Sequence, residues 1–235
     1  VGVYFVRKTF NKELELAKEK KNFILSVTHE LKTPIASSKL FAETILTREI
    51  PKEKRDDILD KIIKDQTRLE KLVENILLIS KVEEHKQHLE REKVNCREFI
   101  ESVIKGLGLS ENAKFDVGSE IEIKIDRFYF TSVIQNLHEN AIKYSTGKEE
   151  IVWSAHQLGN SIFIQIKDHG VGVPSNQREK IFDLFHRIGD ENTRDTKGTG
   201  VGLYIVQKIV TLHNGAIIVK DNQPQGSIFE IELPQ

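Results

Sequence analysis

Cysteine is nearly absent from this chain, which limits its redox and metal chemistry. Cys96 is the only cysteine in 235 residues, so an internal disulfide is impossible. A Cys-based metal site is excluded as well, because such sites need several clustered ligands. Seven of the eight histidines are scattered and are interpreted as ordinary surface or core residues. A reducing compartment fits this composition. Methionine is missing altogether, and the sequence gives no physical reason for that.

Long hydrophobic runs and an excess of one charge are missing too. Lys and Arg total 35 against 36 Asp and Glu, a formal net charge of -1. No broad basic field therefore points to nucleic acid or to an anionic membrane surface. The first six residues, VGVYFV, are apolar but far fewer than the roughly 20 needed to cross a bilayer. Because Arg7 and Lys8 follow, we expect residues 1–8 to be the remnant of a membrane exit, with an ordinary hydrophobic helix start as the alternative.

Two segments carry apolar and small residues at heptad spacing. The first runs from Phe10 to Ile45 and the second from Ile58 to Ile79, with a breaker around Pro51 between them. Two long helices with one short connection predict an antiparallel hairpin over residues 9–84. Further apolar residues lie beside the seams, among them Ile63, Val73 and Leu77. A lone hairpin cannot bury them, so we expect a homodimer with a four-helix bundle; packing on the rest of the same chain is the alternative.

A compact α/β unit is expected over residues 85–235. Asn95, with Glu98 three residues later, has the form of a capping box, and Asp126 is placed to cap a second helix. Alternating residues predict strands over 120–125, 151–157, 161–167, 216–220 and 227–233. The Gly-rich, charged stretch over residues 170–198 is typical of a functional lid. The predicted fold class is therefore multidomain, α followed by α+β.

His29 is the first candidate for chemistry. It lies one position past a seam residue, so its imidazole should project toward solvent, where a neutral imidazole is a competent nucleophile near pH 7. Glu30 can orient the ring or accept its proton. A His beside a Glu on a helix is nevertheless most often part of a solvated face, so this pairing alone is weak.

The second domain contains residues suited to a nucleotide. Asn140 offers a carboxamide oxygen of the kind that Mg²⁺ prefers, and Lys143 lies on the same helix face as a charge for phosphate. An amphipathic surface helix over residues 136–144 is the simpler interpretation. Glycines 198, 200 and 202 precede an apolar helix over 203–212, whose free N–H groups suit a triphosphate.

Asp168 ends a predicted strand and is followed by Gly170 and Gly172. A buried carboxylate at such a position is an acceptor that can bind the exocyclic amine of adenine. An Asx turn leaving the strand is the commoner origin of this pattern.

Taken together, these segments resemble the sequence boxes of sensor histidine kinases. HELKTP around His29 resembles the H box, NLHENAIKYS at 136–145 the N box and DHGVGVP at 168–174 the first glycine box. IFDLFHR resembles the phenylalanine box and GTGVGLYIV the second glycine box. The five boxes occur in the family's order over roughly residues 20 to 233. The resemblance implies a helical dimerisation domain followed by a Bergerat-type α/β sandwich of the kind shared by DNA gyrase and Hsp90 chaperones.

The resemblance also implies roles for individual residues. His29 would be phosphorylated by ATP, with Glu30 beside it, and Asn140 would be the Mg²⁺ ligand. The nucleotide would be bound by Asn136, Asn140, Lys143, Tyr144, Asp168, Gly170, Gly172, Gly198, Thr199, Gly200, Val201, Gly202 and Leu203. Thr33, in the family's Glu-x-x-Thr pattern, implies phosphatase activity, although a hydrogen bond back to the His29 carbonyl is the alternative interpretation.

The family pattern further implies an aspartate of a response-regulator receiver domain as the phosphoryl acceptor, and the cytoplasmic part of an inner-membrane sensor as the setting. Two other functions remain. A conformational ATPase of the gyrase or chaperone type would not need HELKTP on a dimer seam, and a scaffold that only binds nucleotide would not need His29, Asn140 and Asp168 together.

Overall fold

The computed structural model describes residues 2–84, 89–145, 150–188 and 199–235. It divides into two compact units, Val1–Ile76 and Leu77–Gln235, and each is described by itself. Among the described residues, no helix combines the length and the apolar character needed to cross a membrane.

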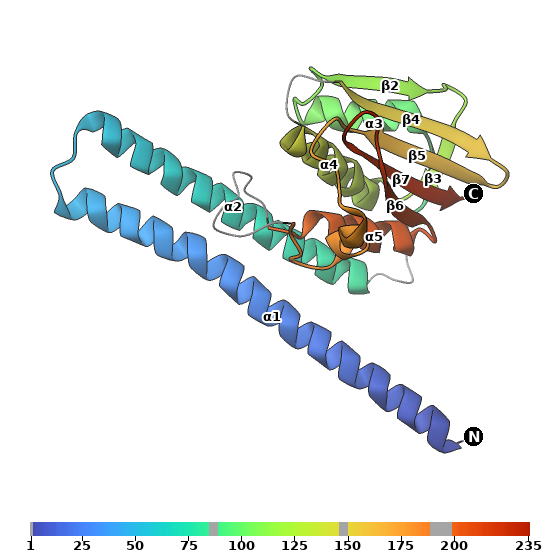
Figure 1. Ribbon diagram of the computed structural model, residues 1–235, viewed down its shortest axis with the longest axis horizontal. Helices are drawn as coiled ribbons and strands as arrows, with labels where there is room; N and C mark the ends of the chain where they lie inside the picture. Colours follow the sequence, from blue (N-terminus) through green and yellow to red (C-terminus); the bar gives the residue numbers. More distant parts are fainter. Residues whose placement is uncertain (1, 85–88, 146–149, 189–198) are drawn as a thin grey trace. The chain divides into compact units, whose positions relative to one another are not determined.

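The first unit is a helical hairpin. Helix α1 spans Gly2–Thr47 and helix α2 spans Lys52–Glu84, with the end of α2 belonging to the second unit (Figure 1). The chain reverses at residues 48–51, where Pro51 disfavours continued helix in the residue before it. Helix α1 continues through Pro34, whose ring is buried. The two helices predicted from the heptad pattern are thus confirmed.

Polar side chains join the two helices of the hairpin. Ser37 donates a hydrogen bond to the Asp65 carboxylate, and Gln66 donates one to Ser38 over 3.4 Å. Several large apolar side chains remain exposed on the hairpin: Ile24, Leu25, Ile35, Leu40, Leu46, Leu59, Ile63 and Val73. These include Ile63 and Val73, which the sequence marked as surplus to one hairpin.

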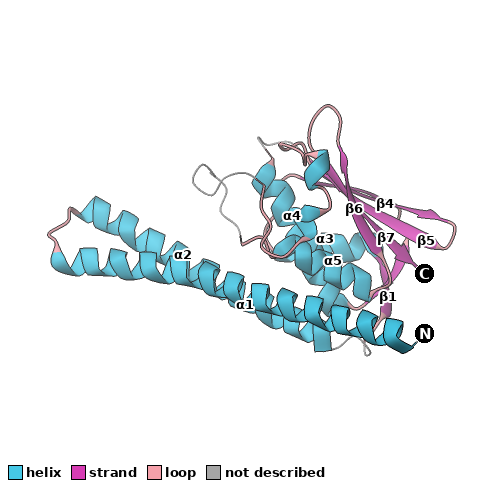
Figure 2. Ribbon diagram, turned by 60° about the horizontal axis from the view of Figure 1, so that its bottom comes forward, coloured by secondary structure: helices cyan, strands magenta, loops and turns pink. Residues whose placement is uncertain are grey.

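The second unit is built on a five-stranded sheet. The strand order is β2-β4-β5-β7-β6, with β2 parallel to β4 and the other neighbours antiparallel. Helices α3, α4 and α5 cover one face of this sheet (Figures 1 and 2). Strands β1 and β3 form a separate antiparallel pair. The bounds are β1 Glu92–Asn95, α3 Cys96–Gly106, β2 Ala113–Val117, β3 Glu122–Ile125, α4 Arg127–Tyr144, β4 Ile151–Leu158, β5 Ser161–Lys167, α5 Gly202–Leu212, β6 Ala216–Asp221 and β7 Ser227–Pro234.

The core lies between the sheet and these helices. Period-2 burial along β5 places Ile162, Ile164 and Ile166 under the helices, and Trp153 of β4 is fully buried beside them. Both predicted caps are present: the Asn95 side chain accepts a hydrogen bond from Glu98 N, and Asp126 accepts from Phe128 N and Tyr129 N. The prediction of a hairpin domain followed by an α+β domain is confirmed.

Three details differ from the sequence analysis. Strand β3 begins at Glu122, because residues 119 and 120 form a turn. Strands β1 and β2 were not predicted. The described part of the expected lid contains two short 3₁₀ helices, η1 Ser175–Gln177 and η2 Lys180–Phe182, and η2 buries Ile181 and Phe182. Residues 189–198 of that stretch lie outside the described residues.

Candidate functional site

His29 lies on α1 with an exposed side chain, as its place beside the heptad seam predicts. The adjacent Glu30 is tied to α2: its Oε2 accepts a hydrogen bond of 2.8 Å from an Arg68 guanidinium nitrogen. The two side chains retain 17% and 27% of their accessible surface, respectively. The carboxylate next to the histidine is therefore held by an ion pair that joins the two helices.

Thr33 lies one turn after His29 on the exposed side of α1. Its hydroxyl donates to the His29 carbonyl over 3.3 Å, the back-bond expected of a threonine in a helix. The hydroxyl oxygen keeps its lone pairs for a further hydrogen bond.

Helix α4 positions the N-box residues. Asp126 caps its start, and the buried residues Val133, Ile134 and Leu137 hold one face against the core. Asn136, Asn140 and Lys143 follow at spacings of four and three, so they share one partly exposed face of the helix beside the buried one.

The N-box side chains differ in their contacts. Asn136 Nδ2 donates to Ser132 O over 2.8 Å, and Lys143 donates to the Tyr144 hydroxyl over 3.1 Å. Asn140 makes no hydrogen bond with any described residue, so its carboxamide is available to a ligand. The described residues contain no group of three or more His, Cys, Asp or Glu side chains that could hold a metal ion. A magnesium ion in this unit would therefore depend on Asn140 and on phosphate oxygens, which its preference for few protein ligands permits.

Asp168 follows the last residue of β5 and is only 4% exposed. Its Oδ1 accepts hydrogen bonds from Gly170 N at 2.8 Å and from Ser227 N at 3.0 Å. Burial raises the pKa of this carboxyl, against the opposing effect of the two backbone donors and of His169. Oδ2 receives no hydrogen bond from the described residues, so it is free to accept one from a ligand.

The second glycine box opens α5 next to the N box. A Cβ atom at Gly202 would overlap the Asn136 side-chain oxygen, so a larger residue there would require Asn136 to move. Among the residues that the structure describes, no side chain caps the start of α5, which leaves its first N–H groups for an anion. Val201, directly before α5, is fully buried in this structure. Gly198 lies outside the described residues.

The remaining boxes meet the same region. Gly170 forms a β-bridge with Ser145, which brings the end of α4 to the first glycine box. Phe185 N donates to Gly200 O over 3.0 Å, which joins the phenylalanine box to the second glycine box. The predicted nucleotide residues on α4, after β5 and at the start of α5 are thus brought together within the second unit, while His29, Glu30 and Thr33 belong to the first.

Two residues of this region were missed by the sequence analysis. Ser227 begins β7, and its backbone exchanges hydrogen bonds with Asp168: Asp168 N donates to Ser227 O over 2.9 Å. Gly226 has φ of +119°, and a Cβ atom there would overlap the Asp168 carbonyl oxygen. A glycine directly before the last predicted strand was the available signal, but its partner lies 58 residues away in the chain.

Two protein families match the chain. Residues 19–85 match the His Kinase A (phospho-acceptor) domain, and residues 118–235 match the histidine kinase-, DNA gyrase B- and HSP90-like ATPases. The sensor protein kinase WalK of Staphylococcus haemolyticus is 31% identical over 99% of this chain and 40% of its own length. WalK of Staphylococcus epidermidis is 32% identical over 99% of this chain and 39% of its own length. The chain thus spans about two fifths of the length of these curated relatives.

Solved structures show the same fold. The Acinetobacter baumannii histidine kinase AdeS superposes with a TM-score of 0.67 at 24% identity, over 88% of this chain and 97% of that one. The histidine kinase ThkA, solved in complex with the response regulator protein TrrA, gives 0.69 at 22% identity over 91% of this chain and 61% of that one. With a phospho-acceptor hairpin and an ATPase-type domain matched in this order, the chain belongs to the sensor histidine kinase family.

Proposed function

We propose that this protein uses ATP to phosphorylate its own His29. Two observations carry the proposal. His29 has an exposed imidazole within the segment that matches the phospho-acceptor domain. The second unit joins the N box, the phenylalanine box and the two glycine boxes to one another and buries the Asp168 carboxylate. The corresponding domains are residues 9–84 for dimerisation and phosphotransfer and residues 85–235 for ATP binding.

The residues of the second unit fit ATP. Asp168 Oδ2 would accept a hydrogen bond from the adenine amine, while the backbone of residues 199–203 and the Lys143 charge would face the phosphates. Asn136 and Tyr144 lie beside these groups on α4. The unbonded Asn140 carboxamide suits Mg²⁺, which when bound neutralises charge on the phosphates.

The reaction requires little covalent activation by the protein. An imidazole nitrogen of His29 forms a bond to the γ-phosphorus, the bond from that phosphorus to the ADP oxygen breaks, and the imidazole releases a proton. Glu30, the next residue in the sequence, carries a carboxylate that would accept that proton, and Arg68 fixes its side chain. Positioning and charge neutralisation supply most of the rate acceleration in phosphoryl transfer.

We infer that His29 then passes the phosphoryl group to an aspartate of a response-regulator receiver domain. The structure of ThkA with its regulator TrrA supports a regulator as partner. The expected docking face is the part of α1 after His29, which includes Ala36, Ser37, Leu40, Phe41 and Thr44. Leu40 is the better probe of this face because it is 62% exposed, whereas Ser37 is hydrogen-bonded to Asp65.

Phosphatase activity toward the same regulator is a second proposed function. Thr33 has an exposed hydroxyl one turn from His29, and its free lone pairs can orient a water molecule. Thr33→Ala should slow decay of purified phospho-regulator while His29 labelling stays near the parent rate. Equal decay with both proteins, each faster than regulator alone, would remove Thr33 from the mechanism.

The main proposal is tested with γ-labelled ATP. The parent protein should gain a label that is lost in acid and retained in base, as a phosphoramidate is. His29→Gln should abolish that label and leave ATP affinity unchanged, whereas His156→Gln, at an exposed histidine on β4, should label like the parent. Phosphate release without a protein label would favour the conformational ATPase instead, and acid-labile label on His29→Gln would overturn the assignment of His29.

A further inference from the structure

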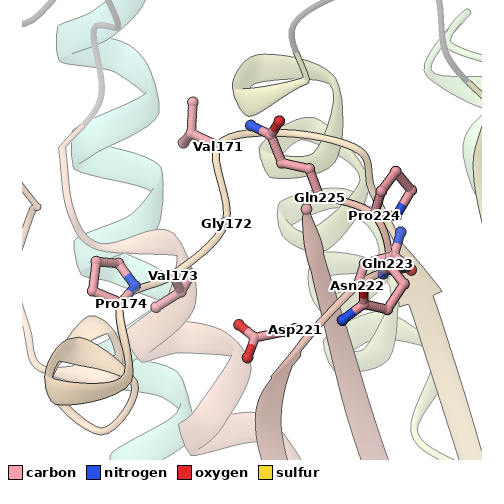
Figure 3. Close-up of a pocket in the computed structure, with 10 residues that line it drawn as sticks. Val171, Gly172, Val173, Pro174, Asp221, Asn222, Gln223, Pro224 and Gln225 are labelled. Atoms are coloured by element: carbon pink, nitrogen blue, oxygen red, sulfur yellow. Dashed lines mark hydrogen bonds between the residues drawn. The ribbon is translucent and has the colours of Figure 1, made fainter.

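The turn between β6 and β7 lies beside the first glycine box. Figure 3 shows residues 171–174 of that box on one side of an open hollow and the turn Asp221–Gly226 on the other. The hollow measures about 390 Å³ and is lined by residues of these two segments. Open space lies between the first glycine box and the β6–β7 turn. Hydrogen bonds at the edges of the hollow therefore hold the turn in place beside the box.

One edge of the hollow is closed by Asn222. Its Nδ2 donates a hydrogen bond of 2.8 Å to the Asp168 carbonyl oxygen, while its Oδ1 accepts from Gln223 N at 2.9 Å. Because the Asp168 carbonyl can only accept and the Gln223 N–H can only donate, the Asn222 carboxamide must point its Nδ2 at Asp168 and its Oδ1 at Gln223. The Asn222 backbone is fixed as well, because its N–H donates to Gly226 O over 3.0 Å.

Asp168 is therefore held from several directions. Ser227 bonds to its backbone N–H and to its Oδ1, Gly170 N bonds to Oδ1, and Asn222 bonds to its carbonyl oxygen. Asn222 is the one side chain among these hydrogen-bond partners in the described residues. It is thus the partner that a substitution can remove without altering the backbone.

A second contact joins the far edge of the hollow. Arg178 donates to Asp221 Oδ1 over 2.5 Å and to the Val173 carbonyl over 3.4 Å. The Asp221 side chain is 63% exposed, so solvent weakens this ion pair. The part-buried hydrogen bond from Asn222 reaches the backbone carbonyl of Asp168 itself, whereas the Arg178 contacts reach only Asp221 and Val173.

We infer that Asn222 is a positioning residue that sets the preference of this site for adenine. It acts by fixing the backbone of Asp168, whose Oδ2 accepts the adenine amine, so the inference rests on the proposed ATP site. Inosine triphosphate carries an oxygen in place of that amine and cannot make this hydrogen bond. Loss of Asn222 should therefore weaken ATP more than inosine triphosphate.

The experiment measures Mg·ATP and Mg·inosine triphosphate affinities of the full chain by calorimetry. Asn222→Asp keeps the side-chain shape and the acceptor for Gln223 N but places a carboxylate oxygen against the Asp168 carbonyl. Asn222→Ala removes the side chain without adding charge. Both should lower the ratio of ATP to inosine triphosphate affinity by roughly two- to tenfold, the effect of one misplaced hydrogen bond.

Gln225→Ala is the matched control, because Gln225 lies on the same turn and its side chain makes no hydrogen bond with the described residues. It should keep the parent ratio. A parallel loss of both affinities in the two Asn222 variants would make Asn222 merely structural and overturn the inference, as would an unchanged ratio. A parent protein that does not bind ATP, or does not prefer it to inosine triphosphate, would overturn the proposed role of Asp168 and the inference with it.

Discussion

At the residue scale, Asp168 combines burial with a charge. Burial raises its pKa, so the ionised carboxylate costs stability at pH values above that pKa. Its Oδ1 is fully used by the Gly170 and Ser227 backbone, whereas Oδ2 has no described partner. Asp168 thus lowers the stability of the fold when ionised and has one carboxylate oxygen without a described partner, which is typical of a residue that binds a ligand.

Asp168→Asn should separate binding from stability. The amide keeps an acceptor at the Oδ1 position and removes the buried charge, so the free energy of unfolding at pH 7 should rise. ATP affinity should fall by roughly ten- to hundredfold, because an N–H group then faces the adenine amine. Calorimetry and urea unfolding measure the two effects. Asp116→Asn, at an exposed position on β2, should change neither, and unaltered ATP affinity in Asp168→Asn would reject Asp168 as the adenine acceptor.

His138 is a buried neutral base within the N-box helix. Trp153 Nε1 donates to its Nδ1 over 3.2 Å, so Nε2 carries the proton and donates to Leu109 O over 3.0 Å. Burial lowers the pKa of His138, and it also lowers the pKa of His213, whose Nε2 accepts from Asp126 N at the start of α4. Protonation of His138 would bring its Nδ1–H against the Trp153 N–H, and protonation of His213 would bring its Nε2–H against the Asp126 N–H.

The stability of the second unit should therefore depend on these histidines. A folded-state pKa below the unfolded value means that their contribution is present above the ordinary histidine pKa of about 6.5 and is lost as the pH falls below it. Urea unfolding at pH 7.5 and pH 5.5 should show a smaller acid loss in His138→Gln than in the parent. His156→Gln, at an exposed position, should keep the parent loss, and equal losses in all three proteins would contradict this account of His138.

At the element scale, the hairpin carries polar contacts where a coiled coil usually carries apolar ones. Ser37 and Asp65, Ser38 and Gln66, and Glu30 and Arg68 bridge α1 and α2 within about three turns of His29. Single polar residues in a helical seam fix register at some cost in stability. Here the register places Arg68 opposite the carboxylate of Glu30, next to the proposed phospho-acceptor His29.

Arg68→Met should slow labelling of His29 by roughly tenfold at saturating ATP, because Glu30 loses the partner that fixes its side chain. The loss should stay below the hundredfold or more that a general base contributes, since Glu30 itself remains. ATP affinity should not change, because Arg68 belongs to the hairpin unit. Arg55→Met, at an exposed position early in α2, is the control. Labelling of Arg68→Met at the parent rate would show that the ion pair does not serve the reaction.

At the scale of the whole molecule, the two units differ in how completely they bury apolar surface. The second unit encloses its own core, whereas the hairpin leaves a row of large apolar side chains exposed, with Ile63 at 64%. Apolar surface of this extent on a helical hairpin favours a second copy of the same chain, which would complete a four-helix bundle.

Ile63→Glu should weaken the dimer by roughly a hundredfold, because an unpaired charge within an apolar interface costs several kcal/mol. Sedimentation equilibrium of the full chain measures this change. ATP affinity should be retained, since the proposed nucleotide site lies in the other unit. Lys54→Glu, an exposed position at the start of α2, should leave the dimer intact. A parent protein that sediments as a monomer at micromolar concentration would contradict the bundle.

Local patterns in the sequence were sufficient for most of the elements. The heptad spacing predicted α1 and α2, the caps at Asn95 and Asp126 predicted where α3 and α4 begin, and alternation predicted β4, β5, β6 and β7. Each of these signals lies within a few residues of the element it specifies, because helix periodicity, capping and strand alternation are short-range effects. The boxes that resemble the kinase family are local in the same sense.

Only the tertiary structure decided which distant residues meet. The pairing of β7 with β5 brings Gly226, Ser227 and Asn222 to Asp168, and the hairpin brings Arg68 to Glu30 across 38 residues. Strand β2 was missed because its five residues gain their hydrogen bonds from the parallel partner β4, not from a turn nearby in the chain. The sequence by itself determined the order of the elements and the residue types offered for chemistry. Sheet register and helix pairing decided their contacts, because those depend on packing between segments that no local pattern encodes.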